Sequence, residues 1–386
     1  MTEKNNLVEE CVLYQLCLAG DTDSCQNAIL KGECDFNAGL AGACRGGHES
    51  LIYLMKNLGA TDFNLGLICA CMGNQPAIVS LMLKFGATKI DNGFYGACIK
   101  GHLTIVYLML SRGVCDIDRG ALTACRYDHL DILMVLIEHG ATNIGYCLQE
   151  ACRKGHVEIV KYLINRDTIV NITDLNKCLY FACFSGSLSI IDLMLERGAN
   201  DLDCALIGAC QSGKLDIANY IIGHGATNME NALYGSCYNG NLELINTFIR
   251  LGATNWNHGL AGACLGGQIE IVKLMKELGA TNLNWGLSNA CLAGYADIVD
   301  LLLEYGGTIT DKCETQARVK KNNNIIKFIK NKRNQKANNT IKKFIYSFQF
   351  QFHISNYYKP PSGAIYLKYK SHFAQKITNF EKIQKK

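Results

Sequence analysis

The sequence predicts an all-α solenoid of about eleven helix-turn-helix repeats of 27 residues, followed by a basic C-terminal tail. Three observations predict it. A cysteine recurs every 27 residues, a glycine follows most of these cysteines by three residues, and an apolar stripe with helical spacing follows each such turn. Length alone would suggest two or three globular domains for 386 residues. Repeats change that count, because stacked repeats share one continuous core.

The cysteines set the phase of the repeat. Their spacing is 27 residues, except for one spacing of 31 between the sixth and the seventh. A Leu or other apolar residue stands four positions before each of them, and a small residue directly before most of them. This spacing predicts a short first helix whose small side chains let another backbone approach closely. We call them the ladder cysteines: Cys17, Cys44, Cys71, Cys98, Cys125, Cys152, Cys183, Cys210, Cys237, Cys264 and Cys291.

Glycines predict where the helices end. Three residues after the ladder cysteine stands Gly in nine of the eleven repeats, and Asn74 or Asp128 in the other two. These residue types tolerate positive φ, so we expect a left-handed cap there. A second helix with apolar residues at i, i+1, i+3 and i+4 follows and ends at a second glycine, such as Gly279. The Asn or Asp five residues beyond that glycine, such as Asn284, is expected to be the N-cap of the next first helix.

Several segments resemble the second half of an ankyrin repeat. They are Gly-Gly-His-Glu-Ser-Leu-Ile at 46–52, Lys-Gly-His-Val-Glu-Ile-Val-Lys-Tyr-Leu at 154–163, and Gly-Gly-Gln-Ile-Glu-Ile-Val-Lys-Leu-Met before Leu-Gly-Ala at 278–280. The resemblance covers roughly residues 10–313. It implies stacked helix pairs that bind proteins and perform no catalysis. The period of 27 is shorter than the usual 33 or so, which implies shortened fingers. Short, cysteine-phased arrays of this type resemble ankyrin-repeat proteins of giant DNA viruses such as mimivirus.

The charge divides the chain into an acidic body and a basic tail. Residues 312–386 hold 18 Lys and Arg against two Glu, a net charge of +16, whereas the preceding residues carry −12. We therefore expect a repeat array over residues 1–313 and a tail over 314–386. An insertion near 168–175 breaks the register, with Asp167 in place of the terminal glycine. It is either a tolerated surface insertion or a longer finger that contacts a partner or bends the superhelix.

The tail allows two interpretations. Its lysines alternate with asparagines, and its aromatic residues from Phe344 to Phe352 recur with the period of a short strand. Basic and aromatic residues together could bind nucleic acid through phosphate contacts and stacking. The alternative is a poorly constrained tail of biased composition, helical near 317–331. The nucleic-acid candidates are Lys320, Lys321, Lys327, Lys330, Lys332 and Arg333.

No catalytic or metal-binding pattern is recognisable. The ladder cysteines are expected to be reduced packing residues, since stacked helices about 8–10 Å apart exceed the reach of a disulfide. His48, His102, His129 and His156 follow a ladder cysteine by four residues, but the turn between them separates each pair. We expect no enzyme activity, no cofactor and no metal. The N-terminus lacks a signal peptide and no apolar run could span a membrane. We therefore expect a monomer located inside the cell, in the cytoplasm rather than the nucleus.

The candidate function is that of a protein-binding scaffold or adaptor. Positions on the first helix three residues before and one or two after the ladder cysteine vary between small, aromatic and basic side chains. Tyr and Arg are favoured anchors at protein interfaces, although half-buried groove residues would show the same pattern. A nucleic-acid-associated adaptor anchored by the tail is the alternative function. The partner-binding candidates are Tyr95, Arg126, Tyr127, Arg153, Tyr180, Phe184, Tyr234 and Tyr238.

Overall fold

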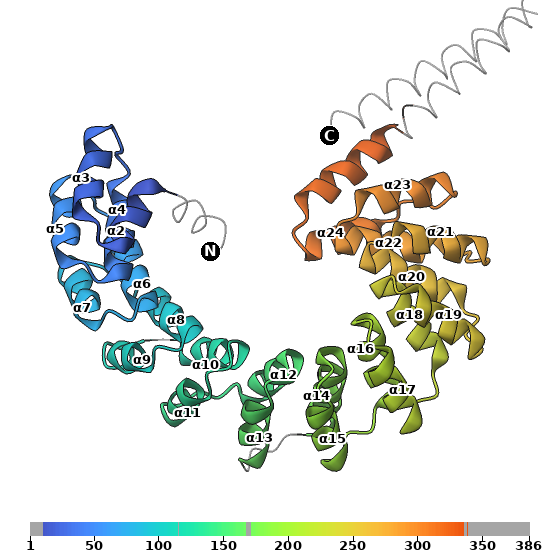
Figure 1. Ribbon diagram of the computed structural model, residues 1–386. Helices are drawn as coiled ribbons and strands as arrows, with labels where there is room; N and C mark the ends of the chain where they lie inside the picture. Colours follow the sequence, from blue (N-terminus) through green and yellow to red (C-terminus); the bar gives the residue numbers. More distant parts are fainter. Residues whose placement is uncertain (1–10, 115, 167–170, 336–337, 339–386) are drawn as a thin grey trace, which may run out of the picture. The chain divides into compact units, whose positions relative to one another are not determined.

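The computed structural model describes residues 11–114, 116–166, 171–335 and 338. Every regular element in these ranges is a helix, and the helices come in antiparallel pairs joined by tight turns (Figure 1). Within residues 12–266, and again within residues 283–319, the first helices of successive repeats pack against one another. Each first helix up to residue 293 also packs against its own second helix. This arrangement confirms the predicted all-α solenoid of helix pairs.

The chain divides into two compact parts, residues 1–280 and residues 281–386. The first part contains ten helix pairs among its described residues. Its first helices are α2 (Val12–Ala19), α4 (Phe36–Gly46), α6 (Phe63–Met72), α8 (Ile90–Lys100), α10 (Ile117–Arg126), α12 (Ile144–Lys154), α14 (Ile172–Ser185), α16 (Leu202–Gln211), α18 (Met229–Asn239) and α20 (Trp256–Gly266). Its second helices are α3 (Thr22–Leu30), α5 (Glu49–Asn57), α7 (Pro76–Lys84), α9 (Leu103–Leu110), α11 (Leu130–Glu138), α13 (Val157–Asn165), α15 (Leu188–Glu196), α17 (Leu215–Gly223), α19 (Leu242–Arg250) and α21 (Ile269–Glu277).

The second part continues the repeat beyond the predicted boundary. It contains α22 (Leu283–Ala293), α23 (Ala296–Glu304) and α24 (Asp311–Val319), and residues 323–335 are also helical. The boundary predicted at residue 313 lies inside α24, and the helix expected near 317–331 overlaps the end of α24 and residues 323–335. Arg318 replaces the ladder cysteine and Lys321, with φ 53°, replaces the capping glycine, so the sequence pattern fades while the helix pair persists. The expected strand from Phe344 to Phe352 lies outside the described residues.

The predicted left-handed caps are confirmed. Every glycine three residues after a ladder cysteine has positive φ, from 76° at Gly213 to 103° at Gly294. The two substitutes do the same, with φ 57° at Asn74 and 64° at Asp128. Asn and Asp can occupy this region because their short polar side chains tolerate it. These caps fix the turn between the two helices of each repeat.

The predicted N-caps were placed two residues too late. The side chain of Asp62 caps α6 by accepting a hydrogen bond of 3.0 Å from the backbone N–H of Leu65. Asn64, the expected cap, lies inside α6. Its Oδ1 accepts hydrogen bonds from the backbone N–H groups of Thr88 (2.8 Å) and Lys89 (2.9 Å) in the next repeat. The residue at this position therefore joins neighbouring repeats. The same bridge is made by Asn37, Asp118, Asn176, Asp203 and Glu230.

The insertion lengthens a first helix. Helix α14 has 14 residues, against 10 or 11 in most first helices of the array, and Asn171 caps it by accepting from the N–H of Asp174 at 2.9 Å. Asn176, expected to be the cap, instead bridges to Asn200. Residues 172–175 of the predicted insertion thus form an added helical turn. Residues 168–170, which begin the predicted insertion, lie outside the described ranges.

The ladder cysteines form the centre of the core, as predicted. All eleven have an exposed fraction of 0%. The apolar residues four positions before them and the apolar stripe of each second helix are buried with them, for example Leu260, Val272 and Met275. This leaves the opposite side of each first helix facing away from the core.

Candidate functional site

The side of each first helix opposite the ladder cysteine carries most of the predicted partner-binding residues. We call it the first-helix face. It consists of the residues six and three positions before the ladder cysteine and one position after it, which fall on the helix side away from the buried stripe. The residue two positions before the ladder cysteine borders this face and lies next to the preceding first helix. Stacking of the repeats places these positions next to one another on neighbouring helices.

Four aromatic candidates form one group on this face. Tyr180 and Phe184 lie on α14, and Tyr234 and Tyr238 lie on α18; all four are half-buried. The hydroxyl of Tyr180 donates a hydrogen bond to Oε1 of Gln211 on α16, the helix between them. Burial raises the pKa of Tyr180 to about 12 and also raises the pKa of Tyr234, so both rings stay neutral at physiological pH. The group offers rigid apolar surface with polar tips, as protein-binding aromatic residues do.

Tyr95 does not belong to the accessible candidates. Only 7% of it is exposed, and the guanidinium of Arg119 lies 4.2 Å from the centre of its ring. Burial and a hydrogen bond with Asp116 raise the pKa of Tyr95 to about 12. Its burial favours the alternative that Tyr95 is a packed groove residue over its role as a partner-binding anchor. Its neighbour in the next repeat, Tyr127, is 46% exposed at the end of α10.

Arg126 and Arg153 share one carboxylate. Oε1 of Glu150 accepts from Nε of Arg126 at 2.7 Å and from a terminal nitrogen of Arg153 at 2.7 Å, and Oε2 accepts from Nε of Arg153 at 2.9 Å. The hydrogen bond from Arg153, followed by that from Arg126, lowers the pKa of Glu150 to about 2. The cluster joins α10 to α12 and keeps one positive charge in excess.

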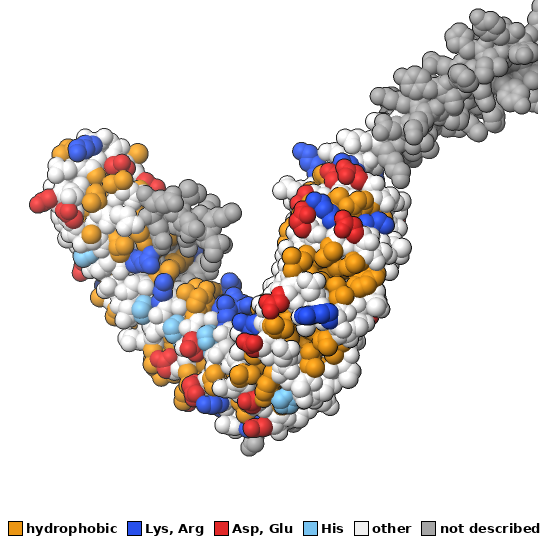
Figure 2. All heavy atoms as spheres, turned by 45° about the vertical axis from the view of Figure 1, so that its right-hand side comes forward, with side chains coloured by type: hydrophobic (Ala, Val, Ile, Leu, Met, Phe, Trp, Pro, Cys, Tyr) orange, Lys and Arg blue, Asp and Glu red, His pale blue; other side chains and the backbone are white. Residues whose placement is uncertain are grey.

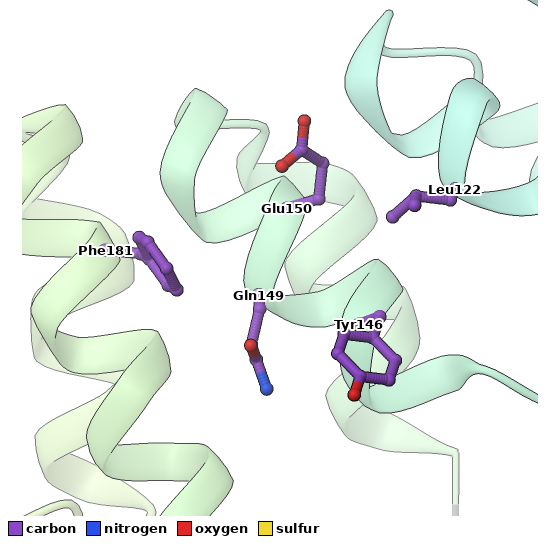
Figure 3. Close-up of a pocket in the computed structure, with 5 residues that line it drawn as sticks. All are labelled: Leu122, Tyr146, Gln149, Glu150 and Phe181. Carbon is purple, nitrogen blue, oxygen red and sulfur yellow. The ribbon is translucent and has the colours of Figure 1, made fainter. Parts of the chain in front are cut away.

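A surface pocket of about 150 Å³ lies beside this cluster. Leu122 on α10 and Phe181 on α14 project toward α12 from opposite sides (Figure 3). Sequence reasoning missed this pocket, because it considered positions three before and one or two after the ladder cysteine and left out those two and six before it. The pocket is lined by Leu122, Tyr146, Gln149, Glu150 and Phe181.

The turn histidines have a structural role. Nε2 of His102 lies 3.0 Å from the carbonyl oxygen of Met72 in the preceding repeat, and Nε2 of His129 lies 3.1 Å from that of Ile99. A carbonyl oxygen only accepts, so each imidazole donates there. His48 and His156 make the same contact, to Leu18 and Arg126. These side chains tie neighbouring repeats together.

The cysteines lie closer to one another than their 27-residue spacing suggested. The structure brings Cys125 next to Cys147, and Cys152 next to Cys178, because a cysteine five positions before one ladder cysteine packs on the preceding one. All the described cysteines are free thiols. Burial raises the pKa of Cys98 to about 12. The part of the chain that the structure describes contains no group of three metal-ligating side chains.

The tail candidates divide into two sets. Lys320, Lys321, Lys327 and Lys330 are exposed. Lys332 forms an ion pair with Asp300, and Arg333 forms ion pairs with Asp311 at 2.9 Å and Glu314 at 3.2 Å. Lys332 therefore joins its helix to α23 of the preceding pair, and Arg333 joins it to α24 of its own pair.

None of the described helices is both long enough and apolar enough to span a membrane. No curated protein matches the chain. A similar solved structure is the crystal structure of the human ASB11 ankyrin repeat domain. It is 22% identical, with a TM-score of 0.39, and the alignment covers 49% of this chain and 98% of that one.

The middle of the array carries a family signature. The family model described as ankyrin repeats (3 copies) matches residues 94–174, 123–205 and 150–232. These overlapping matches include the pocket, the arginine cluster and helix α14, which carries Tyr180 and Phe184. Ankyrin repeats generally mediate protein–protein interactions. The matched part of the chain, within residues 94–232, therefore resembles ankyrin repeats, in agreement with the stacked helix pairs that the structure has there.

Proposed function

We propose that the chain is a non-enzymatic scaffold that binds partner proteins through the first-helix face of its middle repeats. The observation that carries this proposal is the aromatic group of Tyr180, Phe184, Tyr234 and Tyr238. Each of these side chains is half-buried, so packing holds it in place while part of it stays accessible. A pre-ordered aromatic side chain loses little entropy on binding, which is why Tyr residues are common anchors at protein interfaces.

The partners we propose are proteins of the cell in which the chain is located, and the location is the cytoplasm. If the chain has the viral origin that its short cysteine-phased repeats suggest, these partners are host proteins. A monomeric array suits this role, because the first-helix face must remain free for the partner.

A nucleic-acid-associated adaptor is the second candidate function. Four exposed lysines on the last described helix pair favour it: Lys320, Lys321, Lys327 and Lys330. The ion pairs of Lys332 and Arg333 count against it, because they already neutralise two of the six candidate charges. Binding through the four lysines would weaken steeply as the salt concentration rises.

One affinity purification with three full-length proteins tests both candidates. The wild-type chain is compared with a variant in which Tyr180, Phe184, Tyr234 and Tyr238 are alanine, and with a variant in which Lys320, Lys321, Lys327 and Lys330 are glutamine. We expect the alanine variant to lose protein partners that the glutamine variant retains. Circular dichroism must show that both variants keep the helical content of the wild type. Partners retained by the alanine variant but lost with the lysines would favour the nucleic-acid adaptor.

A further inference from the structure

Glycine controls how closely neighbouring first helices approach. In several repeats a glycine stands two positions before the ladder cysteine and packs on the carbonyl oxygen of a residue in the preceding first helix. A Cβ atom on Gly208 would overlap the oxygen of Tyr180, and one on Gly262 would overlap that of Tyr234. The backbones of these neighbouring first helices touch only because the residue at this position has no side chain.

Three successive repeats lack this glycine. The equivalent residues are Thr123 on α10, Glu150 on α12 and Phe181 on α14. Each places a side chain where the glycine-containing repeats have backbone contact, as Cys69 and Asn289 also do in single repeats, and that side chain takes up space between its helix and the preceding one. The pocket between Leu122 and Phe181 occurs at this place in the array. The local sequence therefore accounts for the position of the pocket.

The pocket has apolar walls that suit one large side chain. Leu122 and Phe181 form two of them, and the ring of Tyr146, which is 69% exposed, forms a third. A volume of about 150 Å³ is enough for an aromatic ring, since an apolar cavity of about that size binds benzene in another protein. Gln149 adds an amide to the lining, and its Nε2 donates to Oδ1 of Asp174 at 3.3 Å.

The charges beside the pocket favour an acidic ligand. Glu150 is compensated twice, by Arg126 and by Arg153, which leaves one positive charge in excess. The side chain of Arg126 is 48% exposed, and among the described residues only its Nε has an acceptor. Its terminal nitrogens can thus pair with an incoming carboxylate in the forked geometry that arginine prefers. The nearby Asp174 is paired with Lys177 at 3.5 Å. Figure 2 shows basic side chains next to hydrophobic ones on the surface of the array.

We propose that this pocket binds a short acidic segment of a partner protein, with an aromatic or large aliphatic side chain between Leu122 and Phe181 and an adjacent carboxylate on Arg126. This inference rests on the proposed protein-binding function and specifies its ligand. It places one anchor point of the partner in the repeats where the first helices are held apart, next to the aromatic group of α14 and α18.

Selection from a phage-displayed library of random peptides tests the proposal. The full-length chain is the target, and selected peptides are synthesised with a fluorescent label for affinity measurements. We expect enriched sequences with an Asp or Glu close to a Phe, Tyr, Trp or Leu. Replacing that apolar residue by alanine, or that acid by its amide, should each weaken binding at least about tenfold, as expected for an interface anchor.

Three variants of the chain complete the test. Phe181→Ala removes one wall, and Arg126→Gln removes the free guanidinium while Arg153 still neutralises Glu150. Tyr107→Ala is the matched control, because Tyr107 is an exposed aromatic residue on the second helix α9, with 49% exposure. The first two should each lower the affinity at least about tenfold, and the control should leave it unchanged.

The outcomes separate this inference from the function on which it rests. Peptides that bind Phe181→Ala and Arg126→Gln as tightly as the wild type would overturn the pocket assignment, and so would a selection without the acidic-apolar pattern or without any enrichment. The affinity purification with the four-alanine variant would still report on protein binding as such. Arg126→Gln removes a hydrogen bond to Glu150 but no core contact, so helical content and a cooperative thermal transition like those of the wild type would show that a loss of binding is not a loss of folding.

Discussion

The backbone of Gly262 in α20 lies against the carbonyl oxygen of Tyr234 in α18, without room for a side chain between them. A methyl group at position 262 would force the two helices apart. We therefore expect Gly262→Ala to weaken the interface of these two repeats by about 1–3 kcal/mol, the usual cost of overpacking a tight contact. Native-state hydrogen exchange over α18 and α20 measures this, because the stability of a repeat array is local.

Gly145 provides the matched control for that substitution. It also lies in a first helix, α12, but a Cβ atom added there would have Oδ2 of Asp174 as its nearest neighbour, at 3.9 Å. Gly145→Ala should leave exchange unchanged or slow it, because alanine favours a helix over glycine by up to about 1 kcal/mol. If the two substitutions reduced the protection from hydrogen exchange equally, glycine would not set the spacing between the first helices.

Alkylation should distinguish the ladder cysteines from Cys34. Cys34 is exposed, whereas burial both shields the ladder thiols and raises their pKa, to about 12 for Cys98 and Cys264. Since the thiolate is the reactive form, iodoacetamide at about pH 8 should modify Cys34 quickly and the ladder cysteines only after unfolding. Mass spectrometry of the digested protein gives the modified sites. Rapid modification of ladder cysteines in the folded chain would show that the core is more open than the structure has it.

Acid should remove the contribution that the Glu150 carboxylate makes to the stability of the folded chain. Its pKa is about 2 in the folded chain, below the ordinary 4.5, because the two arginines stabilise the carboxylate. The contribution to stability is therefore complete above pH 4.5 and is lost as the pH falls towards 2. At about pH 6 the wild type should be more stable than Glu150→Gln in urea unfolding, and the difference should shrink below pH 4.5.

The control for the acid experiment is Glu158→Gln. The side chain of Glu158 is 70% exposed, and its one ion pair among the described residues is with Lys161 on its own helix. Exposed ion pairs contribute little to stability. The urea unfolding of this variant should therefore match that of the wild type at both pH values. A pH-independent difference for Glu150→Gln would contradict the assigned role of its charge.

The sequence predicted the helix pairs well because their signals are local. The ladder cysteines and capping glycines recur with a fixed period, and each reports on its own turn or helix face. The N-cap was misplaced because Asp62 and Asn64 are both good caps by residue type. Only the neighbouring repeat decides between them, since Asn64 bonds to Thr88 there. The last helix pair was expected only as helix near 317–331 and not as a repeat, because Arg318 and Lys321 replace both recurring residues.

The site was predictable only in part. Tyr180, Phe184, Tyr234 and Tyr238 stand at variable positions of a regular helix, so their place on the first-helix face follows from periodicity. Tyr95 stands at an equivalent position but is covered by Arg119 from the next repeat, which no local pattern reveals. The run of Thr123, Glu150 and Phe181 in place of glycine was visible in the sequence. Its meaning depends on the spacing between helices, which only the structure provides.

Photo-crosslinking from single positions tests the central claim most directly. A benzoylphenylalanine residue is placed in the full-length chain at Phe184 on the first-helix face, at Tyr107 on a second helix, or at Lys327 on the last helix pair. The account predicts covalent adducts with partner proteins from position 184 and none from positions 107 and 327. Adducts from position 327 or 107, with none from position 184, would contradict it.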